Sequence, residues 1–113
     1  AGGAFGMVLA CDLRIGVETA KFFYPVMKLG FLPQHSDPAR LCALVGPARA
    51  KMILMAGQKI DASSALQWGL LDELVAPSDL MERALAVGTD AMSADLSHIA
   101  AIKSLIGQEC ADA

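Results

Sequence analysis

The chain has 113 residues, of which 55% are hydrophobic, and its formal net charge is -3 at pH 7. This length fits one small domain, and the acidic balance with scattered basic residues argues against a nucleic-acid partner. No uninterrupted apolar run approaches the roughly 18–20 residues that crossing a bilayer requires, so no membrane partner is expected either.

The mean hydropathy of +0.48 is high for a soluble monomer. We interpret the excess as surface that is covered by another chain or by further sequence of a longer protein. Cys11, Cys42 and Cys110 are an odd number of cysteines, each in or beside an apolar segment and without metal-ligand spacing. Buried free thiols are the simplest interpretation, and they favour a reducing compartment, the cytoplasm.

Glycine dominates the first stretch, where Gly2, Gly3 and Gly6 lead into a helix predicted over residues 4–10 and expected to be buried on every side. Glycines let the backbone approach a ligand closely and leave N–H groups free at a helix start. The helix dipole there suits a carbonyl oxygen that acquires negative charge. The alternative is a turn that only lets a helix pack tightly, and the glycines alone leave both interpretations open.

The next part of the chain is predicted to contain strands over residues 12–15 and 20–24, a turn between them, and a loop with one helical turn over 27–33. Gly30 and Pro33 break this loop, because proline cannot continue a helix.

The remainder is predicted to be helical over residues 38–45, 48–56, 62–68, 78–92 and 96–108, with an extended segment over 70–75. Asp37, Asp61 and Ser78 precede helices as capping residues. Gly57 and Gly69 mark helix ends.

Three segments taken together carry a family resemblance: GGAFGMVLACDLRIGVETAKFFYP, then KLGFLP, then ARLCALVGPARAKMILMAGQKIDASSALQWGLLDELV. Their order and spacing resemble the crotonase (enoyl-CoA hydratase/isomerase) superfamily. The resemblance implies an α/β fold, a partial crotonase-like ββα spiral with a helical C-terminal oligomerisation region. Residues 1–77 would form the second half of the spiral core, and residues 78–113 would form part of the trimerisation subdomain.

The resemblance places one of the family's two oxyanion-hole N–H donors at Gly3. The family's hydratases add water with two glutamates, one three residues after this glycine and one directly after the strand-ending proline. Those positions hold Gly6 and Val26 here, and neither side chain transfers a proton. We therefore expect Gly2, Gly6 and Val26 to line the substrate, and we expect little hydration by the usual mechanism.

Other branches of the family carry an aspartate slightly further along, where this chain has Gln34. An amide orients a substrate but takes no proton, so Gln34 is predicted to bind the substrate. His35 is the one candidate base in this loop, although a solvent-facing histidine is the favoured interpretation. Asp37 is interpreted as a helix cap because a proline follows it, and Tyr24 is expected to pack with its hydroxyl at a rim.

The function that the resemblance implies is an acyl-CoA-processing enzyme that stabilises a thioester enolate, a lyase or isomerase of fatty acid metabolism. Its substrate would be a coenzyme A thioester, with no further cofactor and no metal, and it would assemble as a homo-oligomer, a trimer or hexamer. A different class is the alternative: a non-catalytic crotonase-fold subunit that binds acyl-CoA or only assembles.

Overall fold

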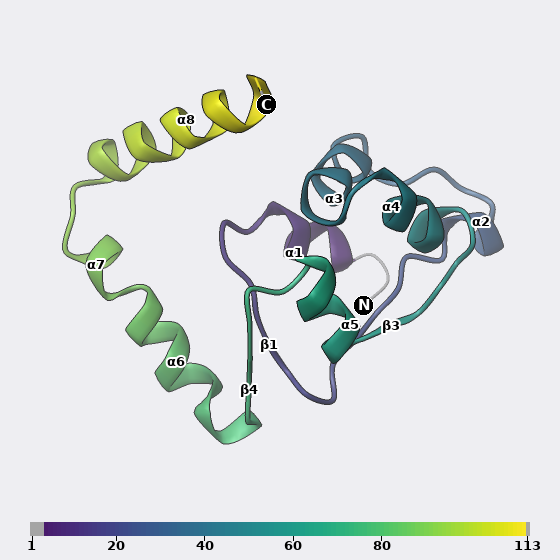
Figure 1. Ribbon diagram of the computed structural model, residues 1–113, viewed down its shortest axis with the longest axis horizontal. Helices are drawn as coiled ribbons and strands as arrows, with labels where there is room; N and C mark the ends of the chain where they lie inside the picture. Colours follow the sequence, from purple (N-terminus) through teal and green to yellow (C-terminus); the bar gives the residue numbers. More distant parts are fainter. Residues whose placement is uncertain (1–3, 113) are drawn as a thin grey trace. The chain divides into compact units, whose positions relative to one another are not determined.

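The computed structural model describes residues 4–112, with side chains over residues 4–107. The chain divides into two compact units, one ending at Leu80 and one beginning at Met81. The first unit contains both helices and short strands, whereas the second is entirely helical outside its turns (Figure 1). None of the described helices combines the length and the apolar character needed to span a membrane.

The strands of the first unit form two separate pairs. β1 (Ile15–Val17) runs parallel to β4 (Glu73–Val75), and the two lie side by side in Figure 1. β2 (Lys21–Phe22) pairs antiparallel with β3 (Ile60–Asp61). β1 begins where the strand predicted over residues 12–15 ends, because residues 11–13 form a bend and Arg14 is held by side-chain contacts rather than by a ladder.

The predicted helices of the first unit are confirmed with small shifts at their ends: α1 (Phe5–Ala10), α2 (Val26–Leu29), α3 (Asp37–Val45), α4 (Pro47–Leu54) and α5 (Ala62–Trp68). Asp61 caps α5 as predicted, since its carboxylate accepts a hydrogen bond of 2.8 Å from the Ser64 N–H. Gly69 ends that helix with φ 88°. A side chain is excluded there, because a Cβ would lie 2.8 Å from the Leu44 carbonyl oxygen.

One hydrophobic core joins these elements. Its fully buried large side chains come from five different segments and are Phe5, Leu41, Ile53, Ile60 and Leu70. α1 packs against α3, and α3 against α4. The prediction that α1 is buried on every side is wrong, because Met7 on its outer face is 75% exposed. Cys11, expected to be buried, is also exposed.

Arg14 ties the start of β1 to the segment before β4. Its side chain is 8% exposed, and its Nε donates to the Leu70 carbonyl at 2.8 Å while Nη1 donates to the Cys11 carbonyl. The backbone N–H of Arg14 donates to Asp72 Oδ2 at 2.7 Å. The Asp72 N–H donates in return to the Arg14 carbonyl at 2.8 Å. The guanidinium thus satisfies carbonyls that the end of α1 and the turn after α5 would otherwise leave unpaired.

The helix predicted over residues 78–92 is divided into three pieces: the 3-10 turn η2 (Pro77–Asp79), α6 (Leu80–Val87) and α7 (Thr89–Met92). The break comes at Gly88, the residue that separates α6 from α7. α8 (Leu96–Asp112) extends four residues beyond the predicted end at residue 108. No side chain over residues 81–107 is fully buried within this chain.

Replacing Arg14 should weaken the fold of the full-length protein. Arg14→Met keeps an apolar stem of similar length but leaves buried carbonyls without donors, so the free energy of unfolding should fall by about 3 kcal/mol. Urea denaturation measures this change. Arg40→Met is the matched control, because Arg40 is exposed and its side chain donates to the exposed Ser36 Oγ at 3.2 Å. Equal loss in both variants would contradict the role assigned to Arg14.

Candidate active site

The candidate site lies around the first turn of α1. Gly2 and Gly3, the predicted substrate-lining and oxyanion residues, lie outside the described residues. Gly6 is described: it is half-buried and stands three positions after Gly3, in a helix that follows the glycine-rich stretch directly.

The carboxylate of Asp37 fills the space above Gly6. A Cβ built on Gly6 would lie 3.2 Å from Asp37 Oδ1 and 2.7 Å from Oδ2, and the second distance is closer than nonbonded atoms tolerate. Asp37 is 3% exposed although it is the first residue of α3, a surface helix position in most proteins. The prediction that Asp37 caps α3 is wrong, because the cap position is Ser36 and no side chain caps this helix.

Tyr24 holds that carboxylate. Its hydroxyl donates a hydrogen bond of 2.7 Å to Asp37 Oδ2, and the hydroxyl oxygen accepts one of 3.3 Å from the Gln34 N–H. The expectation that this hydroxyl lies at a rim is wrong, because Tyr24 is 5% exposed. Its ring packs against Phe5 at 5.7 Å between centroids. Burial raises the pKa of Tyr24, and the hydrogen bond to Asp37 raises it further, so the hydroxyl keeps its proton at neutral pH.

The other predicted site residues are spread over the α2–α3 segment. Val26 is the first residue of α2, buried in the core at 3% exposure. Gln34 presents an exposed side chain and contributes its backbone N–H to Tyr24. His35 occupies the turn before α3 with an exposed side chain. Over the described residues no group of three or more His, Cys, Asp or Glu side chains is arranged to hold a metal ion.

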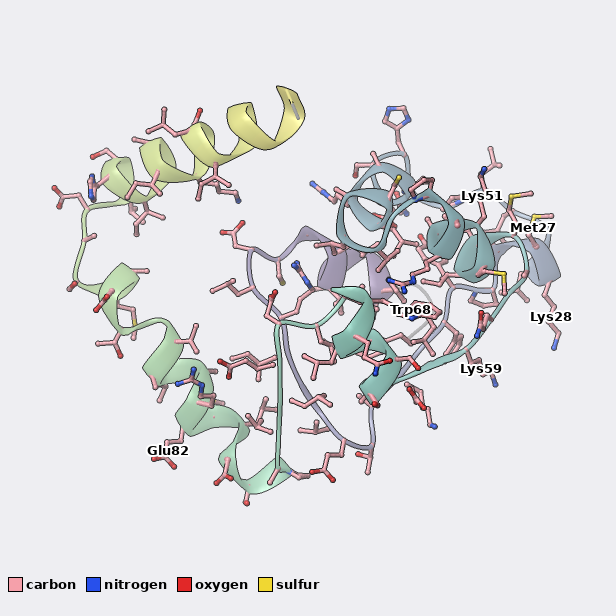
Figure 2. The ribbon with its side chains drawn as sticks, viewed as in Figure 1. Met27, Lys28, Lys51, Lys59, Trp68 and Glu82 are labelled. Carbon is pink, nitrogen blue, oxygen red and sulfur yellow. The ribbon has the colours of Figure 1, made fainter. Side chains whose placement is uncertain are left out.

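A separate hollow of about 460 Å³ opens between α2 and the end of α4. Its lining is mostly apolar and carries two cations, Lys28 and Lys59, which lie on the same side of the unit in Figure 2. Lys59 also stacks over the Phe23 ring at 5.4 Å. A hollow with this lining suits an apolar chain that ends in a negative charge.

Sequence reasoning missed the pair formed by Tyr24 and Asp37. An aspartate before a proline at a helix start is typical of a cap, and a tyrosine among phenylalanines is typical of packing. One signal was available: Gly6 lacks a side chain inside an otherwise apolar helix, which indicates close approach of another group. The sequence does not say which group approaches.

Comparison with known proteins gives a consistent result. The family model described as "Enoyl-CoA hydratase/isomerase" matches residues 1–113. Carnitinyl-CoA dehydratase from Salmonella typhi is 35% identical over 104 residues, which are 92% of this chain and 40% of that protein. The chain therefore spans less than half the length of this relative.

Solved structures resemble the fold closely. Pseudomonas aeruginosa DspI matches with a TM-score of 0.85 and 31% identity, over 93% of this chain and 43% of DspI. An enoyl-CoA hydratase/isomerase from Pseudoalteromonas atlantica matches with a TM-score of 0.86 and 27% identity, over 98% of this chain and 45% of that one.

Adding a methyl group at Gly6 should test the close approach of Asp37. Alanine normally stabilises a helix relative to glycine by up to about 1 kcal/mol. Gly6→Ala should instead lower the free energy of unfolding by about 1–3 kcal/mol, because the methyl displaces a buried carboxylate from Tyr24. Gly107→Ala in α8 is the matched control, since no atom of the described side chains lies within 4 Å of its added Cβ. Chemical denaturation of the full-length variants measures both.

A double-mutant cycle sharpens this test. In an Asp37→Ala background the cost of Gly6→Ala should vanish, because the clashing carboxylate is gone. A cost that persists without Asp37 would show that another contact makes glycine necessary at this position.

Proposed function

This chain belongs to the enoyl-CoA hydratase/isomerase family, the crotonase superfamily, and on that premise we propose that it forms part of an enzyme that enolises acyl-CoA thioesters. The family and the partial α/β crotonase fold predicted from the sequence are confirmed. The activity of the whole protein, its substrate and its partners are the subject of the proposal, because the chain covers 40% of the curated relative.

The observation that carries the proposal is the continuous match of this chain to the family, from the glycine-rich start to the last helix. A relative at 35% identity is named a carnitinyl-CoA dehydratase, which indicates a coenzyme A thioester as the class of substrate. The hollow beside Lys28 and Lys59 suits part of such a ligand, since an acyl chain is apolar and coenzyme A is anionic.

The proposed chemistry begins at the thioester carbonyl. Loss of a proton from the carbon next to that carbonyl moves negative charge onto the oxygen, and N–H donors aimed at the oxygen lower the barrier. Gly3 is the donor that we propose from this chain, because it precedes α1 and the family resemblance places a donor there. No cofactor is required for this step, since the thioester itself stabilises the enolate.

A second candidate function is a non-catalytic subunit that binds acyl-CoA or only assembles. Gly6 and Val26 favour it, because the two positions that carry acids in the family's hydratases hold no ionisable side chain. The two functions differ in one observable property. An enzyme of this kind exchanges the α-protons of a bound acyl-CoA with solvent, whereas a binding subunit does not.

We also propose that the protein is a homo-oligomer, a trimer or hexamer. The second unit exposes large apolar side chains on several turns: Leu85 at 55%, Met92 at 66%, Leu105 at 62% and Ile106 at 59%. Exposed apolar area of this extent favours a contact with another protein surface.

Gly3→Pro should remove the proposed oxyanion donor, since proline has no N–H. The exchange of butyryl-CoA α-protons in D2O, followed by mass spectrometry with the full-length protein, should slow by at least ~10²-fold. Gly3→Ala keeps the N–H, so its exchange rate should fall far less. A folded Gly3→Pro variant with unchanged exchange would assign Gly3 a structural role only, and wild-type protein that binds butyryl-CoA without exchange would favour the binding subunit.

Sedimentation velocity of the full-length protein should show a trimer or a multiple of it at micromolar concentration. Leu105→Glu should shift the distribution toward smaller species, because it places a charge on an apolar contact face. Ser104→Glu is the neighbouring control and should disturb assembly less. A stable wild-type monomer would contradict the proposed assembly.

A further inference from the structure

We propose that Asp37 is the catalytic base of this chain, delivering from α3 a carboxylate to the face of α1 that Gly6 leaves open. This role rests on the proposed thioester chemistry and adds the residue that moves the proton. It differs from the sequence prediction, which named His35 as the candidate base of this segment.

Burial makes Asp37 an unusual residue. The residue is 3% exposed, and burying a charged or polar group without full hydrogen bonding costs several kcal/mol. A capping role does not account for its place, because no side chain caps α3. A turn-forming role does not need the carboxylate to face inward. The position therefore calls for a function that needs a carboxylate removed from water.

Tyr24 orients the carboxylate through one of its two oxygens. The Tyr24 hydroxyl donates to Oδ2 at 2.7 Å. Because burial keeps the proton on Tyr24, that hydroxyl acts as a donor to Asp37 and not as a competing base. In this proposal Oδ1, the oxygen that Tyr24 does not bind, accepts the proton from the substrate.

Gly6 supplies the opening. A side chain at this position would overlap the carboxylate, with Cβ 2.7 Å from Oδ2, and the absence of one lets α1 and Asp37 meet. Gly6 is half-buried, and the carboxylate lies against the backbone of the first turn of α1. Gly3, the proposed oxyanion donor, stands three positions before Gly6 in the sequence, and Gly6 is the residue that Asp37 meets.

The proton transfer balances with these groups alone. Asp37 Oδ1 takes the proton from the thioester α-carbon, the C–H electron pair forms the carbon–carbon double bond of the enolate, and the carbonyl π electrons move to oxygen. With a 3-enoyl thioester, Asp37 returns the same proton to the γ-carbon, and the product is the 2-enoyl isomer. One carboxylate is enough for this shuttle, so isomerisation fits the chain better than water addition by two acids.

Asp37→Asn in the full-length protein tests the role directly. The amide keeps the shape of the side chain and an oxygen for Tyr24 but takes no proton. Exchange of butyryl-CoA α-protons in D2O should fall by at least ~10²-fold, while the Kd for butyryl-CoA from calorimetry stays within about twofold. Asp79→Asn, at an exposed residue of η2, is the matched control and should exchange at the wild-type rate.

Two further variants keep the test decisive. Tyr24→Phe retains the ring contact with Phe5 and should slow exchange by at least ~10-fold with little change in Kd, because the carboxylate loses its orienting donor. His35→Ala should leave exchange unchanged. If Asp37→Asn does not fold, these two variants test the role of Asp37. Wild-type exchange in Tyr24→Phe together with loss of exchange in His35→Ala would overturn it.

The outcomes separate the two proposals. If a folded Asp37→Asn variant exchanges the α-protons of butyryl-CoA as fast as the wild-type protein, the role of Asp37 is overturned and the proposed function stays in place. Wild-type protein that does not bind butyryl-CoA overturns the proposed function and the role of Asp37 with it.

Discussion

The hydrogen bond between Tyr24 and Asp37 is the interaction on which the candidate site depends. It joins the segment after β2 to the first turn of α3, and it sets a buried carboxylate against the bare backbone of Gly6. A carboxylate in this position is costly unless a partner holds it. Tyr24 is that partner, and the ring contact with Phe5 fixes the tyrosine to α1, so segments that contribute to the core also build the site.

Arg14 provides the second constraint, at the other end of α1. By binding the Cys11 and Leu70 carbonyls, it links the turn after α1 to the turn after α5, and its exchange of hydrogen bonds with Asp72 sets the register of β1 beside β4. α1 is therefore held at both ends, by Asp37 near its start and by Arg14 after its end. A short helix of six residues gains from such anchoring, because it is too short to be stable alone.

Local chemistry explains which parts of the fold could be predicted. Asp61 as a cap and Gly69 as a helix end depend on neighbours in sequence, and the structure agrees with them. The site could not be predicted in the same way. Asp37 follows Gly6 by 31 positions, and only packing of α3 on α1 brings them together. In the sequence, Gly6 shows only that a carboxylate is missing from α1. The structure shows that α3 places a carboxylate at the same position.

The most direct measurement of the central claim is a crystal structure of the full-length protein with a bound, unreactive acyl-CoA analogue. Our account predicts a carboxylate oxygen of Asp37 within about 3.5 Å of the carbon next to the thioester carbonyl, with Tyr24 still bound to the other oxygen. An acyl group seated away from Gly6, with His35 or a residue from another part of the protein nearest to that carbon, would contradict it.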